Sequence, residues 1–102
     1  MRIIKEPTLR GYWERHPEAE AGLAKWLDVA RRAQWASLRE VRREYPSADG
    51  VKVASGNTVT VFNIGGNNYR LVVSIKYRWS VIYIRDFLTH AEYSKDSWKK
   101  RH

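Results

Sequence analysis

The fold is decided by the stretch from Thr58 to Leu88, which reads TVTVFNIGGNNYRLVVSIKYRWSVIYIRDFL. Within it, residues 58–64, 69–78 and 81–88 are rich in β-branched and aromatic side chains, which favour extended backbone. The intervening segment 65–68 is Gly-Gly-Asn-Asn, a composition typical of a hairpin connection. The stretch therefore predicts consecutive antiparallel strands joined by short turns.

The residues on either side of this stretch extend the prediction. Apolar residues at helical spacing predict three N-terminal helices, which lie at 7–15, from Pro17 to Ala33, and from the capping residue Ser37 to Tyr45. Short strands are expected at 2–5 and 51–53. Thr89 and Glu92 form a capping box, so a last short helix is expected to start there and to fray into the polar tail. We expect an α+β protein: a small antiparallel sheet of about four to five strands, N-terminal helices packed on one face, and a short C-terminal helix.

Length and composition limit the class of protein. A chain of 102 residues with 43% hydrophobic residues has room for one core, so residues 1–102 are expected to form a single domain. Cysteine is absent, which excludes a disulfide framework, a thiolate zinc site and a cysteine nucleophile. No apolar run reaches the length of a signal peptide core or a membrane span, so a cytoplasmic protein is expected.

Positive charge is concentrated in the second half of the chain. Residues 1–50 carry 10 basic and 8 acidic side chains, whereas residues 51–102 carry 9 basic and 3 acidic ones, net charges of +2 and +6. A field of that sign attracts polyanions, of which nucleic acid is the commonest in a cytosol, with an acidic protein second. The alternative is charge that serves only solubility.

Strand alternation indicates which side chains share a face. On 69–78, Tyr69, Leu71, Val73, Ile75 and Tyr77 are expected to pack on the helices, and Arg70, Val72, Ser74, Lys76 and Arg78 to face the other way. On 81–88, Val81, Tyr83, Arg85 and Phe87 alternate with Ile82, Ile84, Asp86 and Leu88. The pattern predicts a cationic sheet face that carries an aromatic side chain, a surface suited to nucleic acid.

His90 is the first residue of the predicted last helix, and Tyr93 follows three positions later on the same face. The positive end of the helix dipole, with Arg70 or Arg85 nearby, favours a neutral imidazole that can accept or relay a proton. The alternative is an ordinary surface histidine at a strand-to-helix junction.

Other catalytic patterns are missing from the sequence. It holds no phosphate-binding glycine motif, and its His, Asp and Glu residues do not cluster as metal ligands, so no metal or cofactor is expected. The chemistry left is attack by the 2′-hydroxyl of RNA on the adjacent phosphate, which needs orientation, proton transfer and charge neutralisation.

The blocks VFNIGGNNYRLV at 61–72, YIR at 83–85 and THAEY at 89–93, together with the helical first half, resemble the HigB family of toxins from bacterial type II toxin-antitoxin systems. The resemblance implies a RelE-like fold, a metal-independent mRNA endonuclease that acts on translating ribosomes, and a helix-turn-helix HigA antitoxin as partner in a hetero-oligomer. It draws attention to Asn67, Arg70, Arg85, His90 and Tyr93. Ser94 and Asn68 depart from the family pattern, in which an acidic and a basic residue are common.

The resulting hypothesis gives each candidate a role. Arg70 and Arg85 hold the scissile phosphate while His90 or Tyr93 moves a proton, which yields a 2′,3′-cyclic phosphate and a 5′-hydroxyl. Asn67, Lys76, Arg78 and Lys95 are expected to contact the RNA, the last three through phosphates. Two other functions remain open: a non-catalytic basic RNA-binding module, and an inhibitor that uses its basic face on an acidic protein.

Overall fold

A five-stranded sheet with the strand order β1-β5-β4-β3-β2 organises the protein. The computed structural model describes all residues, 1–102. The strands are β1 (Arg2–Ile4), β2 (Asp49–Lys52), β3 (Thr58–Ile64), β4 (Tyr69–Lys76) and β5 (Val81–Thr89). β2 to β5 pair as the expected antiparallel meander, whereas β1 joins the edge of β5 in parallel. The α+β class is confirmed, with one parallel strand added to the antiparallel sheet.

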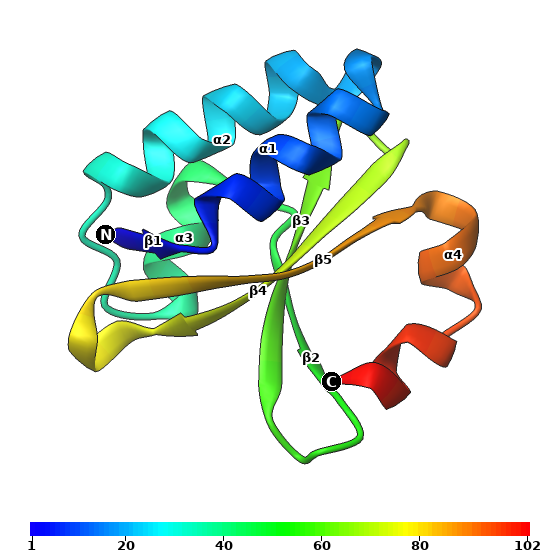
Figure 1. The fold of residues 1–102 in the computed structure, drawn as a ribbon. Helices are drawn as coiled ribbons and strands as arrows, with labels where there is room; N and C mark the ends of the chain where they lie inside the picture. Colours follow the sequence, from blue (N-terminus) through cyan, green and yellow to red (C-terminus); the bar gives the residue numbers. More distant parts are fainter.

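Three helices cover one face of the sheet (Figure 1). They are α1 (Glu6–Arg15), α2 (Glu20–Arg32), which follows the short 3₁₀ helix η1 (Pro17–Ala19), and α3 (Leu38–Glu44). The predicted cap of α3 is confirmed, because Ser37 Oγ accepts a hydrogen bond from the Glu40 amide. Trp26 of α2 points into the core and is fully buried, with its ring 5.4 Å from that of Phe62 on β3. The tryptophans of the helical half therefore serve mainly to fill the core.

The opposite face of the sheet carries the last helical elements, α4 (His90–Ser94) and the 3₁₀ helix η3 (Ser97–Arg101) (Figure 1). The expectation that the chain frays after α4 is wrong. Trp98 is 1% exposed and completes a second, smaller apolar cluster with Val72 and Leu88. Its indole nitrogen donates to the Tyr93 carbonyl at 3.1 Å, and burial of so large a ring outweighs the polarity of its neighbours.

A β-bulge changes which side chains of β5 share a face. Val72 pairs with Asp86 but Val73 pairs with Ile84, so Arg85 is an extra residue in the ladder. Beyond this point the predicted alternation is inverted. Phe87 therefore packs on the helix side and Leu88 on the side of Arg70, the reverse of the expectation.

β4 is shorter than predicted. It ends at Lys76, and residues Tyr77–Trp79 form a 3₁₀ helix, η2, which connects β4 to β5. Arg78 therefore does not lie on the strand with Arg70, contrary to expectation. None of the helices has the length and apolar character that a membrane crossing requires.

Candidate active site

Arg70 is a buried cation without an acidic partner. It lies on β4, on the face of the second apolar cluster, and its residue surface is only 8% exposed. Its Nη1 donates to the carbonyl oxygens of Asn67 at 3.1 Å and Tyr69 at 3.2 Å, and no carboxylate lies within ion-pair distance. Carbonyl dipoles offset only part of the cost of burying a charge. The guanidinium is therefore suited to receive an anion.

His90 lies against this guanidinium. Arg70 Nη2 and His90 Nδ1 are 3.2 Å apart. A guanidinium has no acceptor, so the hydrogen bond requires Nδ1 to accept, which in a neutral ring leaves the proton on Nε2. The capping box of Thr89 and Glu92 fixes the start of α4, and the His90 amide donates to the Asn68 carbonyl at 3.0 Å. The predicted proximity of Arg70 and His90 is confirmed.

Tyr93 completes the group. The Arg70 guanidinium carbon lies 5.4 Å from the centre of the Tyr93 ring, and this ring stacks on Trp98 at 5.4 Å. Burial and the negative charge of Asp49 raise the pKa of Tyr93, and the nearby positive charge of Arg70 offsets this only in part. The hydroxyl therefore keeps its proton at neutral pH and has that proton to donate.

The β3–β4 hairpin positions the carbonyls that hold Arg70. Gly65 and Gly66 adopt φ angles of 62° and 69°, in the left-handed region that glycine enters without strain. Asn63 Nδ2 donates to Asn67 Oδ1 at 3.4 Å, which braces the turn from within. Asn67 thus reaches the site through its backbone carbonyl, while its side chain stabilises the loop.

Arg85 lies on the same face but does not contact this group. Its Nε donates to Ser74 Oγ at 3.0 Å. Ser74 is four residues beyond Arg70 on β4, roughly 13 Å away at the rise of a strand. The structure thus brings Arg70, His90 and Tyr93 together and places Arg85 further along the sheet.

The other three predicted RNA contacts are dispersed. Lys76 ends β4, and the Arg78 guanidinium lies 5.0 Å from the ring centre of Trp79 in η2. Lys95 follows α4 and borders a hollow of about 230 Å³, whose other lining residues are Leu88, Glu92, Ser97, Trp98 and Arg101. These cations therefore lie at three separate elements and form no cluster with Arg70.

A charged contact missed by the sequence argument anchors the C-terminal segment. Asp86 accepts a hydrogen bond from Arg101 Nη2 at 2.7 Å, and His102 Nε2 lies 3.0 Å from the same carboxylate oxygen. Burial alone would raise the pKa of Asp86, but these two partners lower it overall. The contact joins residues 15 and 16 positions apart, so no local pattern in the sequence indicates it.

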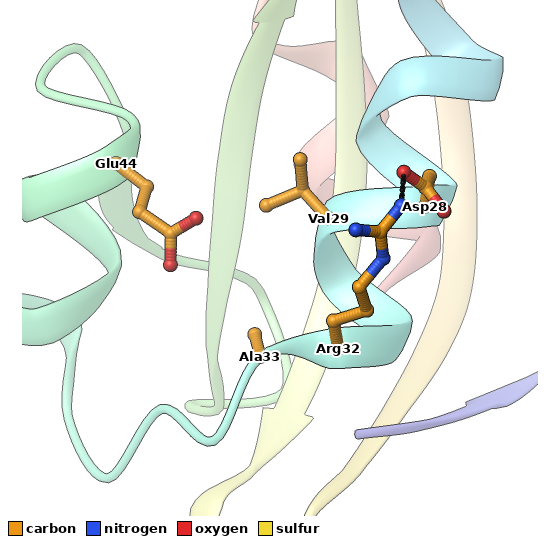
Figure 2. A pocket seen from close by; sticks show the side chains of 5 residues that line it. All are labelled: Asp28, Val29, Arg32, Ala33 and Glu44. Carbon is orange, nitrogen blue, oxygen red and sulfur yellow. Dashed lines mark hydrogen bonds and ion pairs between the residues drawn. The ribbon is translucent and has the colours of Figure 1, made fainter.

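A separate small cavity lies on the helix side of the sheet (Figure 2). It measures about 190 Å³ and lies between α2 and α3, with Asp28 and Arg32 paired on one wall and Glu44 facing them. None of the predicted site residues borders it. Across the protein, no group of three or more histidine or acidic side chains is arranged to hold a metal ion.

Helices on one face of a small, mostly antiparallel sheet define an α+β protein of RelE-like architecture. Residues 19–96 match the HigB toxin family, described as the RelE-like toxic component of a toxin-antitoxin system, and the chain belongs to that family. It is 27% identical over 93 residues to the mRNA interferase toxin HigB of Escherichia coli K12, an alignment that covers 91% of this chain and 88% of that protein. The mRNA interferase HigB of Shigella flexneri matches to the same extent, and that of Escherichia coli CFT073 is 25% identical over 95 residues, covering 93% of this chain and 90% of that protein.

Proposed function

We propose that this protein is a toxin that inhibits translation by cleaving mRNA. The observation that carries the proposal is Arg70: a buried guanidinium without a carboxylate, in contact with a histidine, on a chain similar to proteins named mRNA interferases. Such a cation attracts a phosphodiester and stabilises the charge that develops on it during attack.

The neighbouring groups supply the remaining needs of the reaction. Attack by the 2′-oxygen forms a bond to phosphorus and breaks the bond to the 5′-oxygen, so one proton leaves the 2′-hydroxyl and another reaches the leaving oxygen. Tyr93, whose raised pKa keeps it protonated, is suited to donate the latter. When Arg70 turns to the phosphate, Nδ1 of His90 loses its hydrogen bond. The neutral ring can then carry its proton on Nδ1, which leaves Nε2 free to accept the proton of the 2′-hydroxyl.

Arg85 has a related role on the neighbouring phosphate. Its hydrogen bond to Ser74 holds the guanidinium on the same sheet face, at a position four residues along β4 from Arg70. Lys76, Arg78 and Lys95 would add phosphate contacts that position the strand without reading its sequence.

The partners follow from the family and from this chemistry. A toxic component needs an antitoxin, and we propose a HigA-like helix-turn-helix protein that binds the whole chain as one toxin domain in a hetero-oligomer. Messenger RNA held on the ribosome would be the substrate, which places the activity in the cytoplasm. No cofactor enters the proposed reaction.

The ends of the RNA products test the function. Purified protein is incubated with translating ribosomes and an end-labelled mRNA, and the termini are identified by their response to phosphatase and kinase. Internal cuts that leave 2′,3′-cyclic phosphate and 5′-hydroxyl ends support the proposal. Binding without scission would instead identify an RNA-binding module, and association with an acidic protein but not with RNA would identify an inhibitor.

A further inference from the structure

Two large hydrophobic side chains, Trp79 and Tyr83, are exposed, and they lie four positions apart where β5 begins. Trp79 is 69% exposed and Tyr83 is 37% exposed. Trp79 belongs to η2, the connection between β4 and β5, and Tyr83 follows on β5. Isolated exposed aromatics need no explanation, but two within four positions, on a protein that buries or half-buries its other large hydrophobic side chains, indicate an interaction surface.

Four cations without ion-pair partners lie on β4, β5 and the neighbouring β1, and on the connection η2. Arg2 pairs with Val81 across β1 and β5, and Val81 pairs with Lys76 across β5 and β4, so these side chains share one row on one face. Tyr83 lies in the next row of the same face. Arg78 adds its guanidinium over the Trp79 ring.

None of these cations forms an ion pair, and neither does Arg85, which is held at Ser74 on the same face. The charge of this surface is therefore unneutralised. We define Trp79, Tyr83, Arg2, Lys76, Arg78 and Arg85 as the tip surface.

The backbone holds the tip surface in place. Ser80 adopts a φ of 55°, a left-handed conformation that reverses the chain after η2, and its carbonyl accepts a hydrogen bond from the Arg2 amide at 2.8 Å. An indole on a braced turn loses little conformational freedom when a ligand stacks on it.

The contrast with a second tryptophan of similar geometry is informative. Trp13 on α1 also lies beside an arginine, with the Arg10 guanidinium carbon 5.3 Å from its ring centre. That tryptophan is half-buried against the core, and Glu20 and Asp28 border the same hollow, so the charges around it are mixed. The tip surface has an aromatic face and positive charge only, which matches a single strand of nucleic acid: bases stack on the rings, and phosphates meet the cations.

We propose that the tip surface is a base-stacking subsite for the same single-stranded RNA that is cut at Arg70, several nucleotides from the scissile phosphate. The inference rests on the proposed function for the location of the cut. Lys76 lies six positions beyond Arg70 on β4, a span of about 20 Å on one sheet face, and Arg85 lies between the two. Trp79 supplies the main stacking platform, Tyr83 a second ring, and the four cations bind the phosphates.

Binding of RNA oligonucleotides to variants tests this subsite. The probe is a mixed-sequence 20-nucleotide RNA with 2′-O-methyl groups throughout, which cannot be cut, and a 4-nucleotide RNA of the same chemistry serves as the short probe. Trp79→Leu is expected to weaken binding of the long probe by about 5- to 100-fold, the effect of losing one stacked base. Trp79→Phe should restore most of the affinity, and the short probe should not distinguish these variants from the parent protein. Trp13→Leu is the matched control and should bind like the parent protein.

The outcomes separate this inference from the proposed function. Equal affinity of Trp79→Leu and parent protein for the long probe would overturn the subsite even if mRNA is cleaved normally. Loss of affinity in Trp79→Leu with no mRNA cleavage by the parent protein would keep the subsite and refute the nuclease. Loss of binding to the antitoxin with unchanged RNA affinity would show a protein interface instead, and would also overturn the proposal. Circular dichroism spectra of each variant confirm that the fold is intact.

Discussion

Arg70 Nη2 and His90 Nδ1 lie 3.2 Å apart although twenty positions separate the two residues in the chain. The contact arises because Tyr69 at the start of β4 pairs with Thr89 at the end of β5, so the strand that begins and the helix that follows meet at one end of the sheet. The pairing of these strand ends therefore positions both the proposed phosphate-binding arginine and the proposed proton carrier.

The hydroxyl of Tyr93 is expected to contribute to catalysis and not to folding. Tyr93→Phe keeps the ring that stacks on Trp98 and contacts Arg70, so the melting temperature should barely change. The turnover rate should fall by about 10²- to 10⁴-fold, as expected for loss of a general acid. Single-turnover cleavage and thermal melting measure both effects. An unaltered rate would remove Tyr93 from the mechanism.

The pH profile gives a separate test of the same side chain. Because burial and Asp49 raise the pKa of Tyr93 above its ordinary value of 10.0, the proton-bearing form persists to higher pH than in a free tyrosine. The contribution of this hydroxyl to the rate should therefore remain up to about pH 10. The account is contradicted if the wild-type rate falls with a midpoint well below 10 and Tyr93→Phe lacks that fall.

The cap of α4 should couple stability to activity. Thr89→Ala removes the acceptor for the Glu92 amide at the turn that presents His90, and is expected to cost about 0.5–2 kcal/mol. Cleavage should weaken as well, because the imidazole loses its fixed position. Thr89→Ser keeps a capping hydroxyl and serves as the control, with urea unfolding and cleavage as the two measurements. Identical behaviour of the Ala and Ser variants would argue against the coupling.

Asp86 should make the stability of the protein sensitive to acid. Arg101 and His102 contact this carboxylate, and they lower its pKa below the ordinary 3.8 despite burial. A lowered folded-state pKa means that the stabilisation is complete above the unfolded value and disappears as the pH falls through the folded one.

Asp86→Asn tests this pH dependence. The variant should lose roughly 1.5–3 kcal/mol of unfolding free energy at pH 7, the scale of a hydrogen bond to a charged group. The difference from the wild-type protein should shrink as the pH falls below 3.8. Glu14→Gln on the exposed side of α1 should show neither effect. A stability difference that stays constant between pH 7 and pH 2 would contradict the account.

Sequence patterns predicted the features of the fold that depend on neighbouring residues. The strands of the meander, the capped starts of α3 and α4, and the nearness of Arg70 to His90 follow from alternation, capping and turn residues. The bulge at Arg85 was not predictable, because an extra residue in a ladder depends on the partner strand and leaves no signal in a period-two pattern.

The structure of the C-terminal segment could not be predicted, because it depends on contacts with distant strands. Trp98 lies in a polar, lysine-rich tail, and only the apolar surface formed by Val72 and Leu88 on distant strands explains its burial. The partners of Asp86 come from the same segment, so they could not be assigned while the tail was expected to fray. A single tryptophan among lysines near the end of the chain was the available signal.

A double-mutant cycle measures whether Arg70 and His90 work together in cleavage. Single-turnover cleavage of ribosome-bound mRNA is measured for Arg70→Ala, His90→Ala and the double variant, and circular dichroism verifies each fold. Each single change should reduce the rate by at least about 10²-fold, and the double variant should be far less impaired than the product of the two losses, because the residues act as one unit. Full cleavage by both single variants, or losses that multiply as for independent groups, would contradict the account.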